Sequence, residues 1–111
     1  MSNRIVDDSS IEKVLDYLRD SATECAQKRA NRIYLEEYRK SLKAQLMQAH
    51  NTLPVSAQER EAYAAPEYLQ HLEALKEAVF EDEKARFLRS AADAKIEAWR
   101  TENANIRAMK I

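Results

Sequence analysis

The chain has 111 residues, 33% of them charged and 45% hydrophobic, and its net charge of -1 excludes a polybasic nucleic-acid binder and an acidic mimic as descriptions of the whole chain. A single cysteine excludes an internal disulfide, and the apolar run of about 18 residues that a membrane span needs is absent. The complete lack of glycine excludes a glycine-rich phosphate-binding loop.

A first long helix is predicted from about residue 9 to residue 50. Ser9 followed by Glu12 forms a capping box at its start. Apolar residues then recur at steps of three and four for almost forty residues, which is the pattern of an amphipathic helix. Asn51 and Pro54 are expected to end this helix.

Two further helices are predicted, a short one over residues 56–64 and a long one over residues 66–105. Ser56 with Glu59 forms a second capping box. Pro66 disfavours helical geometry at Ala65 and suits the first position of the last helix. In both long helices the apolar stripe drifts with a period closer to eleven residues than to seven, which predicts weak supercoiling.

Blocks of alternating charge predict how the long helices pair. The net charge is -3 over residues 1–27, +4 over 28–58, -6 over 59–83 and +4 over 84–111. Folding at the proline-containing midpoint sets opposite charges side by side, whereas a parallel pair would set acid against acid. The sequence therefore predicts a single all-α domain, residues 1–111, built as an antiparallel, coiled-coil-like helical hairpin. An interhelical ion-pair layer is expected where Arg29, Arg32, Glu36 and Glu37 face residues 80–89.

Apolar matching suggests a register for this hairpin. It places Leu18 near Trp99, Cys25 near Ala92 and Ile11 near Ile106. The predicted seam residues are Leu18, Cys25, Trp99 and Ile106. Because two helices share only one seam, the buried apolar area is small for the number of residues that must be ordered. We therefore expect a homodimer, in the form of a helix bundle.

Residues able to carry chemistry are few. His50 and His71 can approach each other near Glu67, but a spacing of four between Glu67 and His71 does not fit the Glu-x-x-His pattern of di-iron bundles. Helix-end histidines that satisfy carbonyl groups are the favoured interpretation. Cys25 lies on the apolar stripe with no histidine placed to activate it, so a structural thiol is favoured over a nucleophile. We predict no catalytic, cofactor-binding or metal-binding residue, no small-molecule substrate, and no enzyme activity.

Two surfaces are candidates for binding. Basic and aromatic residues alternate in one stretch, a pattern able to stack bases and pair phosphates; they are Lys28, Arg29, Arg32, Tyr34, Arg39, Lys40 and Lys43. An ion-pair face within the hairpin is the favoured alternative for these residues. The elbow, residues 51–66, carries the candidate partner surface of Leu53, Val55 and Tyr63, with Tyr68 beside it. Leu53 and Val55 have a simpler alternative role, that of closing the end of the hairpin.

Residues 53–108 resemble a family of small helical proteins encoded by tailed phages. The resemblance lies in the elbow motif at residues 58–63 with Tyr68, and in a tail motif at residues 96–107 that contains Trp99 and Arg100. Family members often have Arg-Trp in the middle of the last helix, where this chain has Arg86-Phe87. The resemblance implies a phage protein encoded among recombination and replication genes, and it assigns no activity.

The resulting hypothesis is a non-enzymatic accessory protein of phage DNA recombination or replication. It would act in the host cytoplasm through contact with a protein or with DNA, without a cofactor or a membrane. The N-terminal stretch MSNRIVDDSS agrees with this location, because it lacks the apolar core of a secretory signal. The alternatives are a phage-encoded inhibitor of a host protein and a helper in virion assembly.

Overall fold

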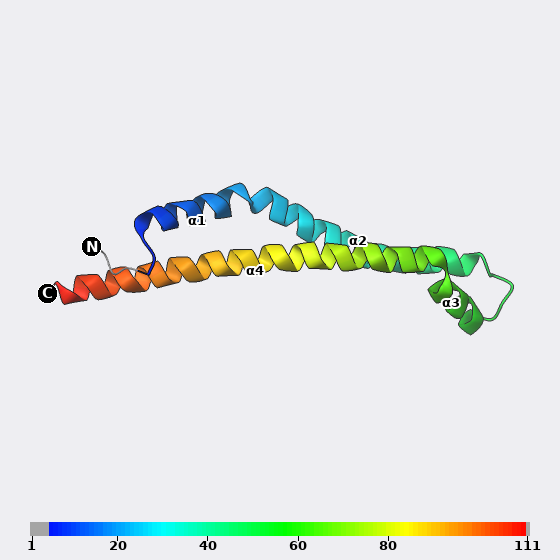
Figure 1. Ribbon diagram of the computed structural model, residues 1–111. Helices are drawn as coiled ribbons and strands as arrows, with labels where there is room; N and C mark the ends of the chain where they lie inside the picture. The colour runs from blue at the N-terminus through cyan, green and yellow to red at the C-terminus, as the bar shows by residue number, and fades with distance from the viewer. Residues whose placement is uncertain (1–4, 111) are drawn as a thin grey trace. The chain divides into compact units, whose positions relative to one another are not determined.

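The computed structural model describes residues 5–110 and contains four α-helices and no strand over that range (Figure 1). The helices are α1 (Asp8–Asp20), α2 (Ala22–Gln48), α3 (Val55–Ala64) and α4 (Pro66–Met109). The predicted all-α class is confirmed. No helix within the described range is long and apolar enough to cross a membrane.

Internal contacts divide the chain into two compact units. The central unit is Ala26–Glu83, and the terminal unit combines the described residues up to Cys25 with those from Lys84 onward. Each unit contains segments that are distant in sequence, because the boundaries fall inside α2 and α4. The expectation of a single hairpin domain stays a prediction.

The start of α1 differs from the predicted one. Asp7 is the N-cap, with an extended backbone, and its Oδ1 accepts the backbone N–H of Ser10 at 2.7 Å. A carboxylate at this position satisfies an unpaired N–H and also lies at the positive end of the helix dipole. The capping box assigned to Ser9 and Glu12 was therefore wrong by two residues, since Ser9 already lies inside the helix.

Ser21 interrupts the single long helix that was predicted over residues 9–50. Its hydroxyl donates to the carbonyl of Tyr17 at 2.6 Å, and Ser21 itself forms a turn between α1 and α2. Such back-bonding by serine competes with the helical ladder and bends helices. Arg89 lies at the same break, where its Nη1 donates to the carbonyl of Leu18 at 3.3 Å and to Ser21 Oγ at 3.2 Å.

The elbow follows its prediction more closely. α2 ends at Gln48, α3 occupies Val55–Ala64, and Pro66 begins α4 after an extended Ala65. The Ser56–Glu59 capping box is wrong, because the N-cap is Pro54 and α3 has no side-chain cap. Instead, the side chain of Gln58 reaches back and donates to the carbonyl of Leu53 at 2.7 Å, which holds the turn against the helix.

Burial along α4 follows a regular heptad. Positions alternating by three and four residues are all buried or half-buried: His71, Leu75, Ala78 and Asp82 in the central unit, and Ala85, Arg89, Ala92, Ile96, Trp99, Asn103 and Ile106 in the terminal unit. Leu69, Leu72, Phe80 and Phe87 are exposed instead. The predicted eleven-residue drift was therefore wrong for the buried face, because it merged these inner positions with apolar residues on the outside.

Within residues 5–110 the buried apolar residues are few, and half of them are alanine. In the terminal unit they are Val6, Ile11, Val14, Ala85 and Ala92, and in the central unit Leu42, Ala62 and Ala78. Alanine on α4 allows neighbouring backbones to approach closely but buries little apolar area. Interactions between polar side chains consequently carry much of the specificity of packing inside each unit.

Candidate functional site

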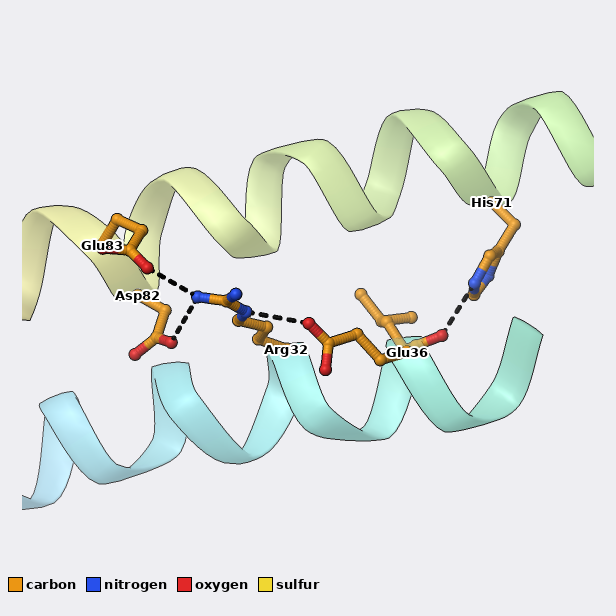
Figure 2. Close-up of polar contacts among 6 residues, drawn as sticks. Arg32, Glu36, His71, Asp82 and Glu83 are labelled. Atoms are coloured by element: carbon orange, nitrogen blue, oxygen red, sulfur yellow. Dashed lines mark hydrogen bonds and ion pairs between the residues drawn. The ribbon is translucent and has the colours of Figure 1, made fainter. Parts of the chain in front are cut away.

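An ionic cluster centred on Arg32 lies between α2 and the first part of α4 in the central unit. Arg32 Nε donates to Glu36 Oε1 at 2.9 Å, and its Nη1 donates to Glu83 Oε1 at 2.9 Å and to Asp82 Oδ2 at 3.2 Å. Figure 2 shows the guanidinium reaching from one helix to the carboxylates of the other. Hydrogen bonding to Glu36, then to Glu83, raises the pKa of Arg32 above its ordinary value.

Lys28 extends this cluster by one turn of α2. Its Nζ lies 3.3 Å from Glu81 Oε2, so that Glu81, Asp82 and Glu83 all meet a cation from α2. The ion-pair layer expected across the two helices is confirmed for Arg32, whereas Glu36 and Glu37 pair with cations of their own helix and Arg29 is exposed. Opposite charges placed at a helix seam specify orientation and register more than they add stability.

His71 bridges the same two helices through a backbone carbonyl. Its Nε2 lies 2.8 Å from the carbonyl oxygen of Leu35, and the residue is only 7% exposed. Because a carbonyl oxygen only accepts, Nε2 must carry the proton. The ring also lies 5.6 Å from that of Tyr38, which stacks on Tyr34 at 6.0 Å.

This geometry gives His71 a structural role. Within residues 5–110, no group of three histidine, cysteine, aspartate or glutamate side chains is arranged to hold a metal ion. His50 is half-buried in the turn after α2. The expected carbonyl-satisfying role is therefore seen for His71, although its acceptor is an interior carbonyl of α2 rather than one at a helix end.

A cluster of Lys43, Tyr63 and Tyr68 fixes α3 within the central unit. Lys43 Nζ lies 4.9 Å from the centre of the Tyr63 ring and 3.7 Å from Glu59 Oε1. Tyr63 and Tyr68 meet edge to face at 5.2 Å. Hydrogen bonding to Tyr63, followed by the charge of Glu59, raises the pKa of Lys43. Ala62, also on α3, is fully buried.

The candidate partner surface thus separates into two parts. Tyr63 and Tyr68 have intramolecular ring contacts that hold α3. Leu53 and Val55 lie at the turn and are 39% and 63% exposed. The alternative in which these two residues close the hairpin end is disfavoured, most clearly for Val55, since most of its side chain faces solvent.

The candidate nucleic-acid residues are largely engaged with carboxylates. Four of them form ion pairs. Lys28 pairs with Glu81, and Arg32 pairs with Asp82 and Glu83. Lys40 pairs with Glu37, and Lys43 pairs with Glu59. Arg29, Arg39 and Tyr34 are exposed. The structure therefore gathers most of this stretch into the ion-pair face that was the alternative interpretation.

In the terminal unit, polar contacts set a register different from the predicted one. Trp99 Nε1 donates to Asp8 Oδ1 at 2.9 Å. Arg89, ten residues before Trp99, contacts the carbonyl of Leu18 and lies 3.9 Å from Cys25 Sγ. The predicted pairing of Leu18 with Trp99 is wrong. Leu18, Cys25, Trp99 and Ile106 are nevertheless all half-buried.

Sequence reasoning missed the two side chains that establish this register. They are Arg89 and Glu102. Arg89 donates to the carbonyl of Leu18. Glu102 Oε1 accepts the backbone N–H groups of Ile5 at 2.8 Å and of Val6 at 3.2 Å. Matching apolar residues across the seam cannot identify polar partners. The available signal was positional, because Arg89 occupies a heptad position between Ala85 and Ala92.

The sequence matches no protein-family model, and neither the curated proteins nor the solved structures contain a match. Inferences about function therefore depend on the chemistry of the surfaces described above and on the resemblance noted in the sequence.

Proposed function

We propose that the chain is a non-enzymatic helical hairpin that dimerises and acts through protein contact, as an accessory protein of phage DNA recombination or replication in the host cytoplasm. The resemblance of residues 53–108 to small helical phage proteins supports the biological setting. The chemistry of the exposed residues supports the mode of action.

The observation that carries protein contact is the exposed apolar tip of the elbow, Leu53 and Val55. The hydrogen bond from Gln58 to the carbonyl of Leu53 holds this turn, and the Lys43–Tyr63–Tyr68 cluster holds the helix that follows. Apolar side chains presented on a positioned loop are typical of contact sites. A partner that covers them gains apolar burial without first having to order the loop.

Protein contact is favoured over direct DNA contact because of the ion pairs on α2. A phosphate that bound Lys28, Arg32 or Lys43 would have to displace Glu81, Asp82, Glu83 or Glu59. Counterion release, the main source of affinity for DNA, is reduced where protein carboxylates already neutralise the cations. We expect no binding to single- or double-stranded DNA even at low salt, measured by fluorescence anisotropy.

Dimerisation is supported by large apolar side chains that stay exposed on α4. In the central unit they are Leu69, Leu72 and Phe80. Covering such residues with a second copy buries apolar area that the single chain leaves in water.

Affinity capture tests the elbow directly. Wild type, a Leu53→Glu/Val55→Glu variant and a Thr52→Glu control are used as baits in lysates of phage-infected and of uninfected cells. The proposal expects a phage-encoded DNA-metabolism protein that wild type and the Thr52→Glu control capture and the double variant does not. Capture of a host enzyme, or of a virion protein, in the same pattern would instead support the inhibitor or assembly function. Equal capture by all three baits would show that the elbow is not the contact site.

A further inference from the structure

The first part of α4 carries a second apolar face in the central unit. Leu69 and Phe80 are 54% and 58% exposed, and Leu72 is exposed between them. Leu69 and Phe80 are eleven residues apart, about three turns at 3.6 residues per turn, so that their side chains leave the helix in nearly the same direction. The buried His71 and Ala78 and the half-buried Leu75 lie on the opposite side of the helix. We call Leu69, Glu73, Lys76 and Phe80 the outer face.

Charge on the outer face points to a specific occupant. Glu73 and Lys76 are both exposed between Leu69 and Phe80, so the face contains an acid and a base at mirrored positions between two large apolar residues. A second copy of the helix running in the opposite direction, with the twofold axis between residues 74 and 75, brings Leu69 opposite the second copy's Phe80. The same operation brings Glu73 opposite the second copy's Lys76. Both contacts occur twice, because an isologous interface repeats every pair.

A parallel arrangement lacks this complementarity. In register, it places Lys76 against the second copy's Lys76 and Glu73 against the second copy's Glu73. Like charges directly opposed across a helix interface disfavour the pairing. The pattern of this face therefore selects an antiparallel copy of itself.

We propose that the outer face of α4 is the self-association surface, and that two chains pair through it in antiparallel orientation. This proposal rests on the dimerisation stated above and identifies its surface. The elbow residues Leu53 and Val55 lie outside the outer face, so the two proposals concern different residues.

Sedimentation equilibrium over a concentration series tests the location of this surface. Wild type is expected to dimerise, whereas Leu69→Glu and Phe80→Glu are expected to be monomeric at every concentration. Ile33→Glu is the matched control, because Ile33 is a similarly exposed apolar residue of the central unit but lies on α2. A wild-type monomer, a dimer that survives both outer-face variants, or a dimer broken only by Ile33→Glu would overturn the proposal.

Charge reversal tests the orientation independently of folding. Lys76→Glu turns two attractive pairs into repulsive ones and is expected to weaken the dimer roughly tenfold. The Glu73→Lys/Lys76→Glu double variant exchanges the two charges and is expected to restore the wild-type dissociation constant. If the double variant is no tighter than Lys76→Glu, the antiparallel register is wrong.

The elbow capture experiment separates the two proposals. Leu69→Glu is expected to retain capture of any partner that depends on Leu53 and Val55. Loss of dimerisation with retained capture supports the separation of the two surfaces. Retained dimerisation with no captured partner removes the proposed function and leaves the outer-face proposal standing.

Discussion

Polar side chains occupy several positions where a helix pair normally buries apolar ones. His71, Asp82 and Arg89 lie on the heptad of α4, and each reaches a partner within its own unit: the carbonyl of Leu35, the guanidinium of Arg32, and the carbonyl of Leu18. A buried polar group is costly when its partner is absent, so each of these contacts disfavours other registers.

His71→Ala is expected to lower the free energy of unfolding by about 2–3 kcal/mol, because the variant loses a hydrogen bond and leaves a cavity next to Tyr38. Urea denaturation measures the change. His50→Ala is the matched control and is expected to change stability by less than about 0.5 kcal/mol. Equal effects of the two substitutions would show that the contact with Leu35 contributes nothing.

Asp7→Ala is expected to lower stability measurably through the loss of an N-cap, whereas Asp7→Asn keeps a capping oxygen and Ser9→Ala changes stability little. The hydrogen bond from the N–H of Ser10 lowers the pKa of Asp7 below its ordinary value. Because the pKa of Asp7 is lower in the folded chain, its ionised carboxylate stabilises the folded state fully above the pKa of the unfolded chain. This stabilisation is lost as the pH falls through the pKa of the folded chain. The difference between wild type and Asp7→Asn should therefore shrink on acidification. A larger effect of Ser9→Ala than of Asp7→Ala would restore the cap predicted from the sequence.

At the scale of elements, the sequence predicts the last two helices well and the first one poorly. Pro66 and the prolyl effect on Ala65 fix the start of α4 by local sterics, which a sequence displays directly. At the break, Ser21 accepts a hydrogen bond from Arg89, which is distant in sequence, and periodicity alone carries no sign of this contact. The buried and exposed faces of α4 could likewise not be distinguished from the sequence, because an exposed phenylalanine and a buried alanine both count as apolar residues in the periodic pattern.

Arg89→Met is expected to destabilise the protein by about 1–3 kcal/mol, because the carbonyl of Leu18 and Ser21 Oγ lose a charged donor at the helix break. Lys84→Met, an exposed cation on the same helix, serves as the control and should be close to neutral. Thermal denaturation followed by circular dichroism measures both. A neutral Arg89→Met would mean that the break is set by Ser21 alone.

For the whole molecule, the proposed dimer makes thermal stability depend on concentration. Because association stabilises only the folded chain, the Tm of wild type should rise over a hundredfold increase in protein concentration. Phe80→Glu should show a Tm independent of concentration over the same range. A constant Tm for wild type would count against a dimer in solution.

The antiparallel register of α1 against α4 underlies the contacts described in the terminal unit, and Trp99, the single tryptophan of the chain, reports on it directly. A short-range fluorescence quencher is attached through Ser9→Cys or Arg19→Cys in a Cys25→Ser background, and each labelled chain is mixed with excess unlabelled Trp99→Phe/Cys25→Ser chain. Positions 9 and 19 are separated by about 15 Å of helix. Strong quenching from position 9 and weak quenching from position 19 is expected, because Asp8 hydrogen-bonds to the indole. Stronger quenching from position 19, or equal quenching from both, would contradict the register.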